Sequence, residues 1–449
     1  MTPLLVLTLA GLAIAGANAA LGLRNLGLYR RSASVEGMEA RARERVSSAR
    51  LAVCIPARNE EENIEACVRA VLSSEGVDLR VVVYDDGSTD GTAEALERLA
   101  GEDERLVVAP RRSLPAGWNG KQHGCARCAA LAFGLASSPG LAEGAAGVPA
   151  DGETEAAEAG ASCGVFAGGE RATHVLFIDA DVRLTPDAAA RALGEFARRS
   201  ADVESSAIRG CAGFGLLSTF PRQRTGTLSE ALVVPLIFFL LLSYLPFRRM
   251  RETLAPAASA ACGQFILVCR EAYIASGGHS SFASSMHDGI KMPRAVRRAG
   301  YMSDIFDGAD VASVRMYQGF EQTWRGFTKN AFEGLGSVAL LVFLTVMNLL
   351  GHVAPPLVVV LAPVVSAVSG AGLPVLAWFA ALAATLLPVV QRVVTADRLE
   401  HAATGALLHP VGVTLMAAIQ WRSFYLHVTG KRSWRGRVES AGSGRMRAA

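Results

Sequence analysis

The 449-residue chain has little net charge, with 44 basic and 41 acidic residues giving a formal charge of +3 at pH 7. A balance this close to neutral offers no basic surface for nucleic acid, so we expect no nucleic-acid partner. The sequence also lacks the ligands of a structural zinc site, because Cys125 and Cys128 form a lone C-x-x-C without a second pair. We therefore expect reduced thiols that pack as small apolar side chains.

Charge is also missing from residues 3–23, in a chain that is 51% hydrophobic and has a positive mean hydropathy. An apolar run of about 20 residues is long enough to cross a bilayer. A cleaved signal peptide would carry its basic residues before the run, whereas Arg24, Arg30 and Arg31 follow it. The sequence therefore predicts a transmembrane anchor at residues 1–23, with the chain after it in the cytosol.

Strands and helices are predicted to alternate in the region that follows. Short apolar segments predict strands at 51–55, 79–84, 105–109 and 175–178, and apolar residues at helical spacing predict helices at 60–72, 90–100 and 120–136. This alternation indicates an α/β fold with a parallel sheet covered on both faces. In such sheets the ligand lies at the carboxyl ends of the strands.

Two segments depart from this pattern. Residues 137–172 are rich in Gly, Ala, Glu and Ser, and we predict a disordered acidic insertion there. Residues 231–247 are apolar and flanked by arginines, so hydropathy alone would allow a membrane span. A span would place the acidic motifs before and after it on opposite sides of the membrane. We therefore predict an interfacial or re-entrant helix.

The sequence from residue 336 to residue 421 is strongly apolar. Candidate spans are 336–352, 353–369, 373–391 and 404–421, and the prolines at 355 and 356 leave open whether the first two are one longer element. Four spans would return the basic tail, residues 422–449, to the cytosol. We expect a multi-pass protein of the cytoplasmic (inner) membrane whose catalytic domain is cytosolic.

Polar motifs follow two consecutive strands. The first is Pro-Ala-Arg-Asn-Glu-Glu at 56–61, and the second is Asp-Asp-Gly-Ser-Thr-Asp-Gly-Thr at 85–92. The second motif by itself is also typical of an ordinary turn and helix cap. Two such stretches at neighbouring strand ends favour a ligand site, where a carboxylate can accept a hydrogen bond from a base N–H.

A third motif, Asp179-Ala180-Asp181, ends the strand at 175–178. Carboxylates at alternate positions of an extended chain point the same way. They suit a hard divalent cation that bridges phosphate oxygens. The alternative is an acidic pair at the start of the following helix, and the motif alone favours neither.

Taken together, the three motifs resemble those of the inverting family-2 glycosyltransferases, which have the GT-A fold. The resemblance covers roughly residues 50–335, without 137–172. It implies a nucleotide-sugar donor, expected to be a UDP-sugar, and a Mg²⁺ or Mn²⁺ cofactor. The residues it implies are Pro56, Ala57 and Glu60 in the nucleotide pocket, Asp86 on the base, and Asp179 and Asp181 on the metal and diphosphate.

Residues 114–121, Leu-Pro-Ala-Gly-Trp-Asn-Gly-Lys, are similar to the P-x-G-W-x-G-K segment of a narrower group that includes hopanoid-associated and carotenoid glycosyltransferases. The likeness implies that Lys121 reaches the phosphate or sugar of the donor, as a compact cation can. The alternative is a surface lysine at a helix start.

Two later segments match the family in part. In Met286-His287-Asp288-Gly289, Asp288 stands where the family has its catalytic base, and His287 replaces the first residue of an acidic pair. The segment 322–326 resembles the Q-x-x-R-W motif of processive synthases, with glycine in place of tryptophan. The likeness implies that Gln322 and Arg325 lie in the donor site, with Arg325 on the diphosphate.

The sequence as a whole predicts a membrane-bound enzyme of the EC 2.4 hexosyltransferase type. We expect it to transfer a sugar to a hydroxyl or carboxyl group of a carotenoid, hopanoid or polyprenyl lipid. One alternative is an exopolysaccharide synthase, which Gly326 disfavours. The other is a non-catalytic membrane scaffold with the same fold, which the intact acidic residues disfavour.

Overall fold

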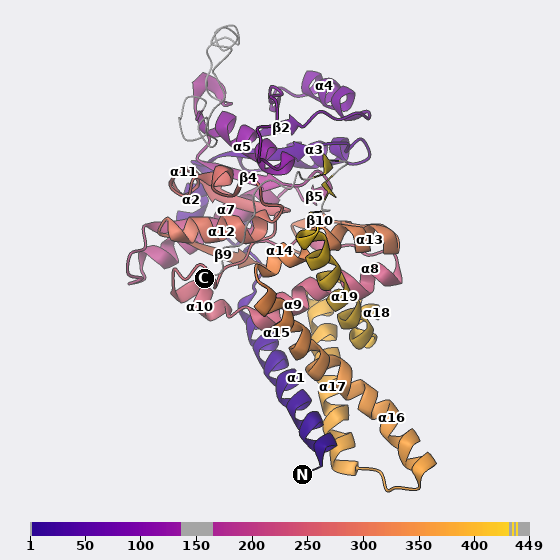
Figure 1. The fold of residues 1–449 in the computed structure, drawn as a ribbon. Coiled ribbons are helices and arrows are strands. Elements are labelled where there is room, and N and C mark those ends of the chain that lie inside the picture. Colours follow the sequence, from indigo (N-terminus) through magenta and orange to yellow (C-terminus); the bar gives the residue numbers. More distant parts are fainter. Residues whose placement is uncertain (1, 136–164, 431–432, 435–436, 439–449) are drawn as a thin grey trace. The chain divides into compact units, whose positions relative to one another are not determined.

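The computed structural model describes residues 2–135, 165–430, 433–434 and 437–438, shown as coloured ribbon in Figure 1. The chain divides into two compact units. One, here called the α/β unit, comprises Arg31–Pro221 and Arg248–Val314. The other, here called the helical unit, comprises Met1–Arg30, Arg222–Phe247 and Arg315–Ala449.

A seven-stranded sheet with the strand order β3-β2-β1-β4-β8-β6-β9 forms the centre of the α/β unit. β1, β2, β3 and β4 run parallel, whereas β8 is antiparallel to both β4 and β6, and β6 is parallel to β9. The strands are β1 (Arg50–Ala57), β2 (Asp78–Asp85), β3 (Leu106–Val108), β4 (His174–Ile178), β6 (Gly213–Thr219), β8 (Phe265–Cys269) and β9 (Tyr301–Phe306).

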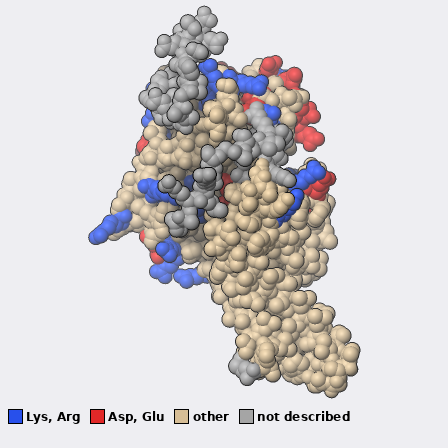
Figure 2. Space-filling model, in the orientation of Figure 1, with Lys and Arg blue, Asp and Glu red and all other residues tan. Residues whose placement is uncertain are grey.

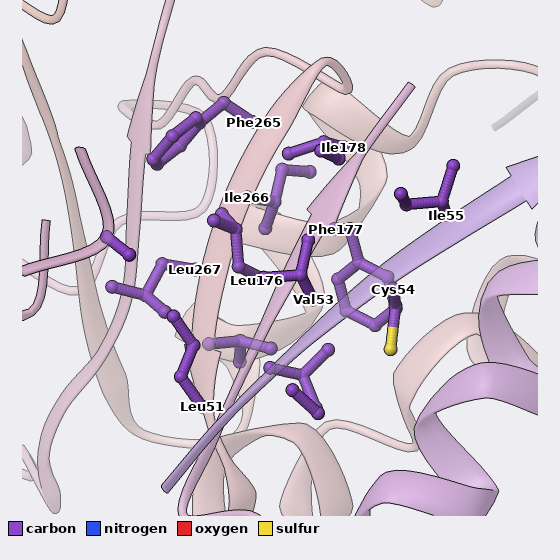
Figure 3. Close-up of a cluster of buried hydrophobic side chains, with 14 of the residues drawn as sticks. Leu51, Val53, Cys54, Ile55, Leu176, Phe177, Ile178, Phe265, Ile266 and Leu267 are labelled. Atoms are coloured by element: carbon purple, nitrogen blue, oxygen red, sulfur yellow. The ribbon is translucent and has the colours of Figure 1, made fainter. Parts of the chain in front are cut away.

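The middle strands of this sheet form the core of the unit. Their apolar residues are covered on both faces, which is typical of parallel strands flanked by helices. Figure 3 shows side chains from β1, β4 and β8 packed together, among them Val53, Leu176 and Leu267, all fully buried. This continuous packing fixes the three strands against one another, and with them the loops that follow their ends.

The α/β unit contains the helices α2 (Ala40–Ser47), α3 (Ile64–Leu72), α4 (Thr92–Glu102), α5 (Gly120–Phe133), α7 (Ala188–Glu204), α10 (Phe247–Glu252), α11 (Arg270–Ala275) and α12 (Asp288–Arg298). Of these, α3, α4 and α5 lie within or close to the helices predicted at 60–72, 90–100 and 120–136, and the others were not predicted. A short pair, β5 (Val182–Leu184) and β10 (Ala312–Val314), is antiparallel. The predicted α/β class is confirmed.

Most of the predicted insertion at 137–172 lies outside the described residues, but its last eight residues are part of the unit. Phe166 and Ala172 are buried in the core. Ala172 N donates to Ala132 O over 2.9 Å, and Thr173 N donates to Arg50 O over 2.9 Å. The predicted boundary at 172 is therefore wrong, because apolar contacts and backbone hydrogen bonds order the chain from residue 165.

Three helices of the helical unit are long and apolar enough to cross a membrane: Pro3–Leu28 (α1), Val338–Ser369 and Val375–Arg398 (α17). The middle one is a single run of α15 (Val338–Asn348), a π-helical turn (Leu349–Val353) and α16 (Ala354–Ser369). The two spans predicted at 336–352 and 353–369 are therefore one element. Figure 2 shows no charged side chain on the visible surface of the part formed by α16 and α17.

The segment predicted as an interfacial or re-entrant helix at 231–247 is broken at Pro235 into α8 (Leu228–Val233) and α9 (Leu236–Tyr244). α9 packs against α1, where Asn25 Nδ2 donates to the carbonyls of Leu242 and Leu245 over 2.7 Å each.

The remaining elements of the helical unit are β7 (Arg222–Gln223), α13 (Gly319–Thr328), α14 (Ala331–Leu335), α18 (Thr404–Leu407) and α19 (His409–Val428), with the short strands β11 (Ser433–Trp434) and β12 (Arg437–Val438).

Candidate active site

The carboxyl ends of β1, β2 and β4 lie at one edge of the sheet. Ala57 pairs with Asp85 at the ends of β1 and β2, and Cys54 pairs with Phe177 near the ends of β1 and β4. Asp179 follows β4 directly, so all three predicted motifs meet there. α5 lies close to this edge because Gly124 has no side chain: a Cβ atom there would be 3.1 Å from Pro56.

Hydrogen bonds join the first two motifs. Asn59 N donates to Ser88 Oγ over 2.9 Å, and Thr89 N donates to Asn59 Oδ1 over 2.8 Å. Asn59 adopts a positive φ of 53°, a region that asparagine tolerates better than most residues. Gly91 N adds a 2.9 Å hydrogen bond to Glu61 Oε2. The two loops thus form one rigid rim.

Asp86 is part of this rim, and its side chain is 7% exposed. Its backbone N–H donates to Ala57 O over 2.9 Å, and one carboxylate oxygen is 3.7 Å from Arg58 Nη1. Arg58 also donates to the carbonyls of Asp86 and Gly87. The sequence argument gave Arg58 no role, although it lies within the first motif. Its positive charge, set against the acidic residues of the second motif, was the feature that could have indicated this contact.

Lys121 links two of the predicted acidic residues. The Asn119 side chain caps α5 by accepting from Lys121 N over 3.0 Å, which fixes the first turn of the helix. Lys121 Nζ then lies 2.7 Å from Asp179 Oδ1 and 3.0 Å from Asp288 Oδ2. A single ammonium group therefore joins the acidic pair after β4 to the acid that begins α12.

The pKa values of these groups follow from this arrangement. Burial by itself would lower the pKa of Lys121, but Asp179 and Asp288 hold it well above its usual value. Burial likewise opposes ionisation of Asp288, yet the Lys121 ammonium outweighs it and lowers the pKa of Asp288. Lys121 and Asp288 are therefore both charged at neutral pH.

Asp181 lies in a different electrostatic environment. Burial, followed by the nearby carboxylates of Asp179 and Glu60, raises the pKa of Asp181 to about 7. Its Oδ1 atom is buried and has no hydrogen-bond partner within the described part of the chain. Glu60 is held at the rim by a 2.8 Å hydrogen bond from its backbone N–H to Thr92 Oγ1. Positive charge is thus deficient around Asp181.

Asp288 lies against the backbone of a second loop. Ala261 N donates to Gly289 O over 2.8 Å, and Asp288 Oδ1 accepts from Gly289 N over 2.8 Å. A Cβ atom at Gly263 would collide with the Asp288 carboxylate, and one at Gly289 would be 2.5 Å from Ala261 O. Gly263 is a second residue whose role the sequence did not reveal, because only the packing shows why it has no side chain.

Gln322 and Arg325 lie on α13, in the helical unit. Gln322 Oε1 accepts from Gln318 N over 2.9 Å. Arg325 is largely exposed and pairs with Glu321 over 2.7 Å. Their assignment to the donor site stays a prediction. Gly326, which replaces the motif's tryptophan, lies directly against Tyr317, so a side chain there would collide with the tyrosine ring.

Sequence comparison finds known proteins that are similar to the part of the chain that carries these motifs. The sequence profile of Glycosyl transferase family 2 matches residues 52–125, which run from β1 through both loop motifs into α5. The 4,4'-diaponeurosporenoate glycosyltransferase of Staphylococcus aureus (strain USA300) is 24% identical over 311 residues, 67% of this chain and 68% of the relative. Residues 52–125 therefore match the family-2 glycosyltransferases, and the enzyme is a glycosyltransferase similar to a carotenoid glycosyltransferase.

Two solved structures are also similar to this glycosyltransferase. A mannosyltransferase from Pyrobaculum calidifontis in complex with GDP-Man and Mn²⁺ has a TM-score of 0.46 at 14% identity, covering 94% of this chain and 99% of its own. Glucosyl-3-phosphoglycerate synthase from Mycobacterium tuberculosis has a TM-score of 0.33 at 18% identity, covering 65% of this chain and 78% of its own.

The glycosyltransferase carries its loop motifs at the strand ends of an α/β sheet, and it also has three helices long and apolar enough to cross a membrane. Within the α/β unit, the structure brings Lys121, Asp179 and Asp288 into direct contact. Asp179 and Glu60 both lie close enough to Asp181 to interact with it electrostatically. The remaining residues predicted for this unit, Pro56, Ala57 and Asp86, lie at the adjoining strand ends.

Proposed function

We propose that this glycosyltransferase transfers a sugar, with inversion, from a nucleotide-sugar donor to a hydroxyl or carboxyl group of a membrane lipid. The observation that carries the proposal is the contact of Lys121 with both Asp179 and Asp288. This contact supports the proposal because Asp288, the predicted base, and Asp179, predicted to contact the diphosphate, share one lysine side chain. A base must lie close to the donor for in-line attack.

The residues after β4 fit a divalent cation. Within the described residues, no group of three or more His, Cys, Asp or Glu side chains is placed to hold a metal. A carboxylate pair nonetheless suits Mg²⁺ or Mn²⁺, which keep waters and bind substrate phosphates. The unpartnered, buried Oδ1 of Asp181 and the raised pKa of that residue agree with a missing positive charge. When bound, the cation would offset the charge that develops on the departing diphosphate.

The chain's own residues would perform the remaining steps. The loop rim formed by residues 58–61 and 85–92 would bind the nucleoside, with Asp86 accepting from the base. Lys121 would contribute its positive charge to the diphosphate. Asp288, already ionised in the absence of substrate, would take the proton from an acceptor hydroxyl. A carboxyl acceptor is ionised at neutral pH and has no proton to give up, so it would not need this step.

The proposed acceptor is a lipid for two reasons. The relative from Staphylococcus aureus is named for a 4,4'-diaponeurosporenoate acceptor, and three helices of this chain are suited to a bilayer. Transfer of a single sugar fits better than polymer synthesis, because Tyr317 occupies the space that the tryptophan of a processive synthase motif would need beside Gly326. UDP-sugars remain the donors we expect.

We further propose that α1, Val338–Ser369 and α17 cross the cytoplasmic membrane and that the α/β unit is cytosolic. Arg30 and Arg31 follow α1, which supports a cytosolic location for the chain after it. With two C-terminal spans instead of the four predicted, the chain after α17 still returns to the cytosol, because both numbers are even. Labelling of a cysteine placed at Ala255 by a membrane-impermeant reagent in intact cells would contradict this topology.

Replacement of Asp288 by Asn tests the proposed base. With a hydroxyl acceptor, we expect turnover to fall about 10² to 10⁴-fold while donor binding stays near the parent level. With a carboxylate acceptor the loss should be smaller, because no proton is removed. Turnover would be measured with detergent-purified protein and radiolabelled UDP-sugars, and donor binding by calorimetry.

Asp202→Asn is the matched control, because Asp202 is exposed on α7 and forms only a surface ion pair with Arg198. This control should match the parent in both assays. If Asp288→Asn transfers sugar to a hydroxyl acceptor at the parent rate, Asp288 is not the base.

A further inference from the structure

A small cavity in the helical unit lies between α9, α17 and the segment that leads into α18. Arg392 and Thr395 of α17, His401 of the connecting segment and Phe239 of α9 line it. The other lining residues are Pro235 and three alanines, and none is acidic. Arg392 is only 5% exposed, so the cavity contains a buried cation.

In the part of the chain that the structure describes, the hydrogen-bond partners of this cation are neutral carbonyl groups. Arg392 Nη1 donates to Gly405 O over 2.8 Å and Nη2 donates to Ala231 O over 3.4 Å. A guanidinium group has five N–H donors, so further donors remain. Glu400, the acid next to His401 in sequence, pairs with Arg222 over 2.8 Å. A buried charge is costly unless an opposite charge compensates it, and nothing lining this cavity does so.

His401 adds a second polar group. Its Nδ1 lies 3.4 Å from Gln223 O, a carbonyl that can only accept, so Nδ1 carries the proton. Its Nε2 is therefore a lone-pair acceptor in the neutral ring, and it is buried without a hydrogen-bond partner within the described part of the chain. An anion beside this ring would favour its protonation, and Nε2 would then donate as well.

The location along α17 suggests where the anion comes from. Arg392 lies six residues before Arg398, the last residue of α17, which is about 9 Å along a helix axis. If this end of α17 faces the cytosol, as the proposed membrane placement requires, Arg392 lies near the depth of the lipid headgroups. Basic pockets between transmembrane helices on the cytoplasmic side commonly bind anionic headgroups.

We propose that this cavity, here called the Arg392 pocket, binds the headgroup phosphate of a membrane phospholipid that carries a net negative charge. The space holds about one water-sized group, which matches a single phosphate oxygen that enters from the mouth. Arg392 donates to that oxygen, and His401 contacts the phosphate. Phe239 and the neighbouring alanines provide an apolar wall for the rest of the lipid. The proposal rests on the membrane placement and not on sugar transfer.

Binding can be measured with the full-length chain in nanodiscs. One set contains phosphatidylcholine alone and a second contains an equimolar mixture of phosphatidylcholine and phosphatidic acid. A third set contains phosphatidylcholine with inorganic phosphate in the buffer. We expect phosphatidic acid alone to raise the thermal midpoint of the parent and to remain bound in native mass spectrometry.

Two variants should remove this effect. Arg392→Gln removes the cation and should lower the affinity for phosphatidic acid about tenfold or more. Ala402→Trp covers the mouth from an exposed position that lines the pocket, so it should fold even if the buried substitution does not. Arg422→Gln is the control, because it removes an exposed arginine of α19 that stacks on Tyr425.

The proposal is overturned if both variants fold and phosphatidic acid stabilises them as much as the parent. If only Ala402→Trp folds, the same response from that variant overturns it. It is also overturned if inorganic phosphate stabilises the parent as much as the lipid does, since the site would then take free phosphate. Because these readouts are binding and stability, loss of sugar transfer by Asp288→Asn leaves them unaffected, and the two proposals fail independently.

Discussion

The two units bury polar groups in opposite ways. The α/β unit buries full charges in pairs, as where Lys121 lies between Asp179 and Asp288, or where Asp304 receives both Arg199 and Arg251. Apart from Arg392 and Glu230, the helical unit mostly buries neutral amides, hydroxyl groups and rings, which bond to one another or to backbone carbonyls.

The contact between α1 and the helices around it illustrates the second mode. Asn18 Nδ2 lies 3.1 Å from the Tyr244 hydroxyl and 3.0 Å from His352 Nε2, and the Tyr244 hydroxyl donates to Asn348 Oδ1 over 3.0 Å. Neutral groups cost less than charges to place in an apolar bundle. In the α/β unit the buried charges are compensated by opposite charges, whereas the contacts of α1 with its neighbouring helices are made by neutral groups.

The largest effect should come from breaking the charge pairing at the site. Lys121→Met keeps the chain length but removes the ammonium group, and we expect sugar transfer to fall about 10²-fold or more. Because Lys121 lowers the pKa of Asp288, its loss raises that pKa, so the acidic limb of the rate profile moves to higher pH. Measured kcat/KM against pH for parent and variant checks both effects.

Lys291→Met, on α12, serves as the control for this prediction, since Lys291 makes no contact with the acidic residues of the site in the described structure. A Lys121→Met enzyme with parent kcat/KM would show that the site does not depend on the buried pair.

A smaller effect is expected at Glu230, a charged exception in the helical unit. Burial opposes ionisation of Glu230, but hydrogen bonds from Gly226 N and Gly319 N, with Thr227 and Arg315, lower its pKa to about 2. A lowered pKa stabilises the fold above the unfolded value near 4.5, and this stabilisation is lost as the pH falls toward 2.

Glu230→Gln should therefore be less stable than the parent at pH 7, by about 1.5–3 kcal/mol for a lost charge-assisted hydrogen bond. The difference between the two should shrink as the pH approaches 2. Chemical denaturation in detergent at several pH values measures it. A difference that does not change with pH would mean that the ionised form contributes nothing. Glu321→Gln, which removes an exposed carboxylate from α13, should show no such dependence.

The smallest effect is expected within the neutral network. Asn25→Leu removes the two hydrogen bonds to α9, and we expect a loss of about 0.6–1.7 kcal/mol, the range for polar contacts between helices in membranes. Leu23→Ala, on the exposed side of α1, is the control. Steric-trapping measurements in bicelles would quantify the difference. A loss as large as that from a buried ion pair would remove the contrast between the units.

The sequence was sufficient for the part of the site that depends on strand ends. Strand-length apolar segments stop at Pro56, Asp85 and Asp179, and parallel pairing then brings their ends together. The contact between Lys121 and Asp288 could not be derived in this way. It depends on the antiparallel pairing of β8 with β4, and the sequence pattern gave no register for that pair.

The helical unit was less predictable, because uniform hydropathy does not mark where one helix ends. The π-helical turn at Leu349–Val353 continues the helix where a division was expected, just before Pro355. Proline is tolerated in the first turn of α16, where its missing N–H costs little. With 20 residues, α19 is long enough to cross a membrane. It is not among the three candidate spans, because it is less apolar than they are.

The backbone bonds that flank residues 136–164 have a consequence for how such a chain varies in length. Leu135 N donates to Ala130 O over 2.8 Å, while Ala172 N returns to Ala132 O over 2.9 Å. Residues 135 and 172 are therefore both fixed beside the same helical turn of α5, and β4 begins two residues after the second of them. Residues can be gained or lost at this position without moving Asp179, and this makes it a natural place to join a fluorescent or affinity domain to the enzyme.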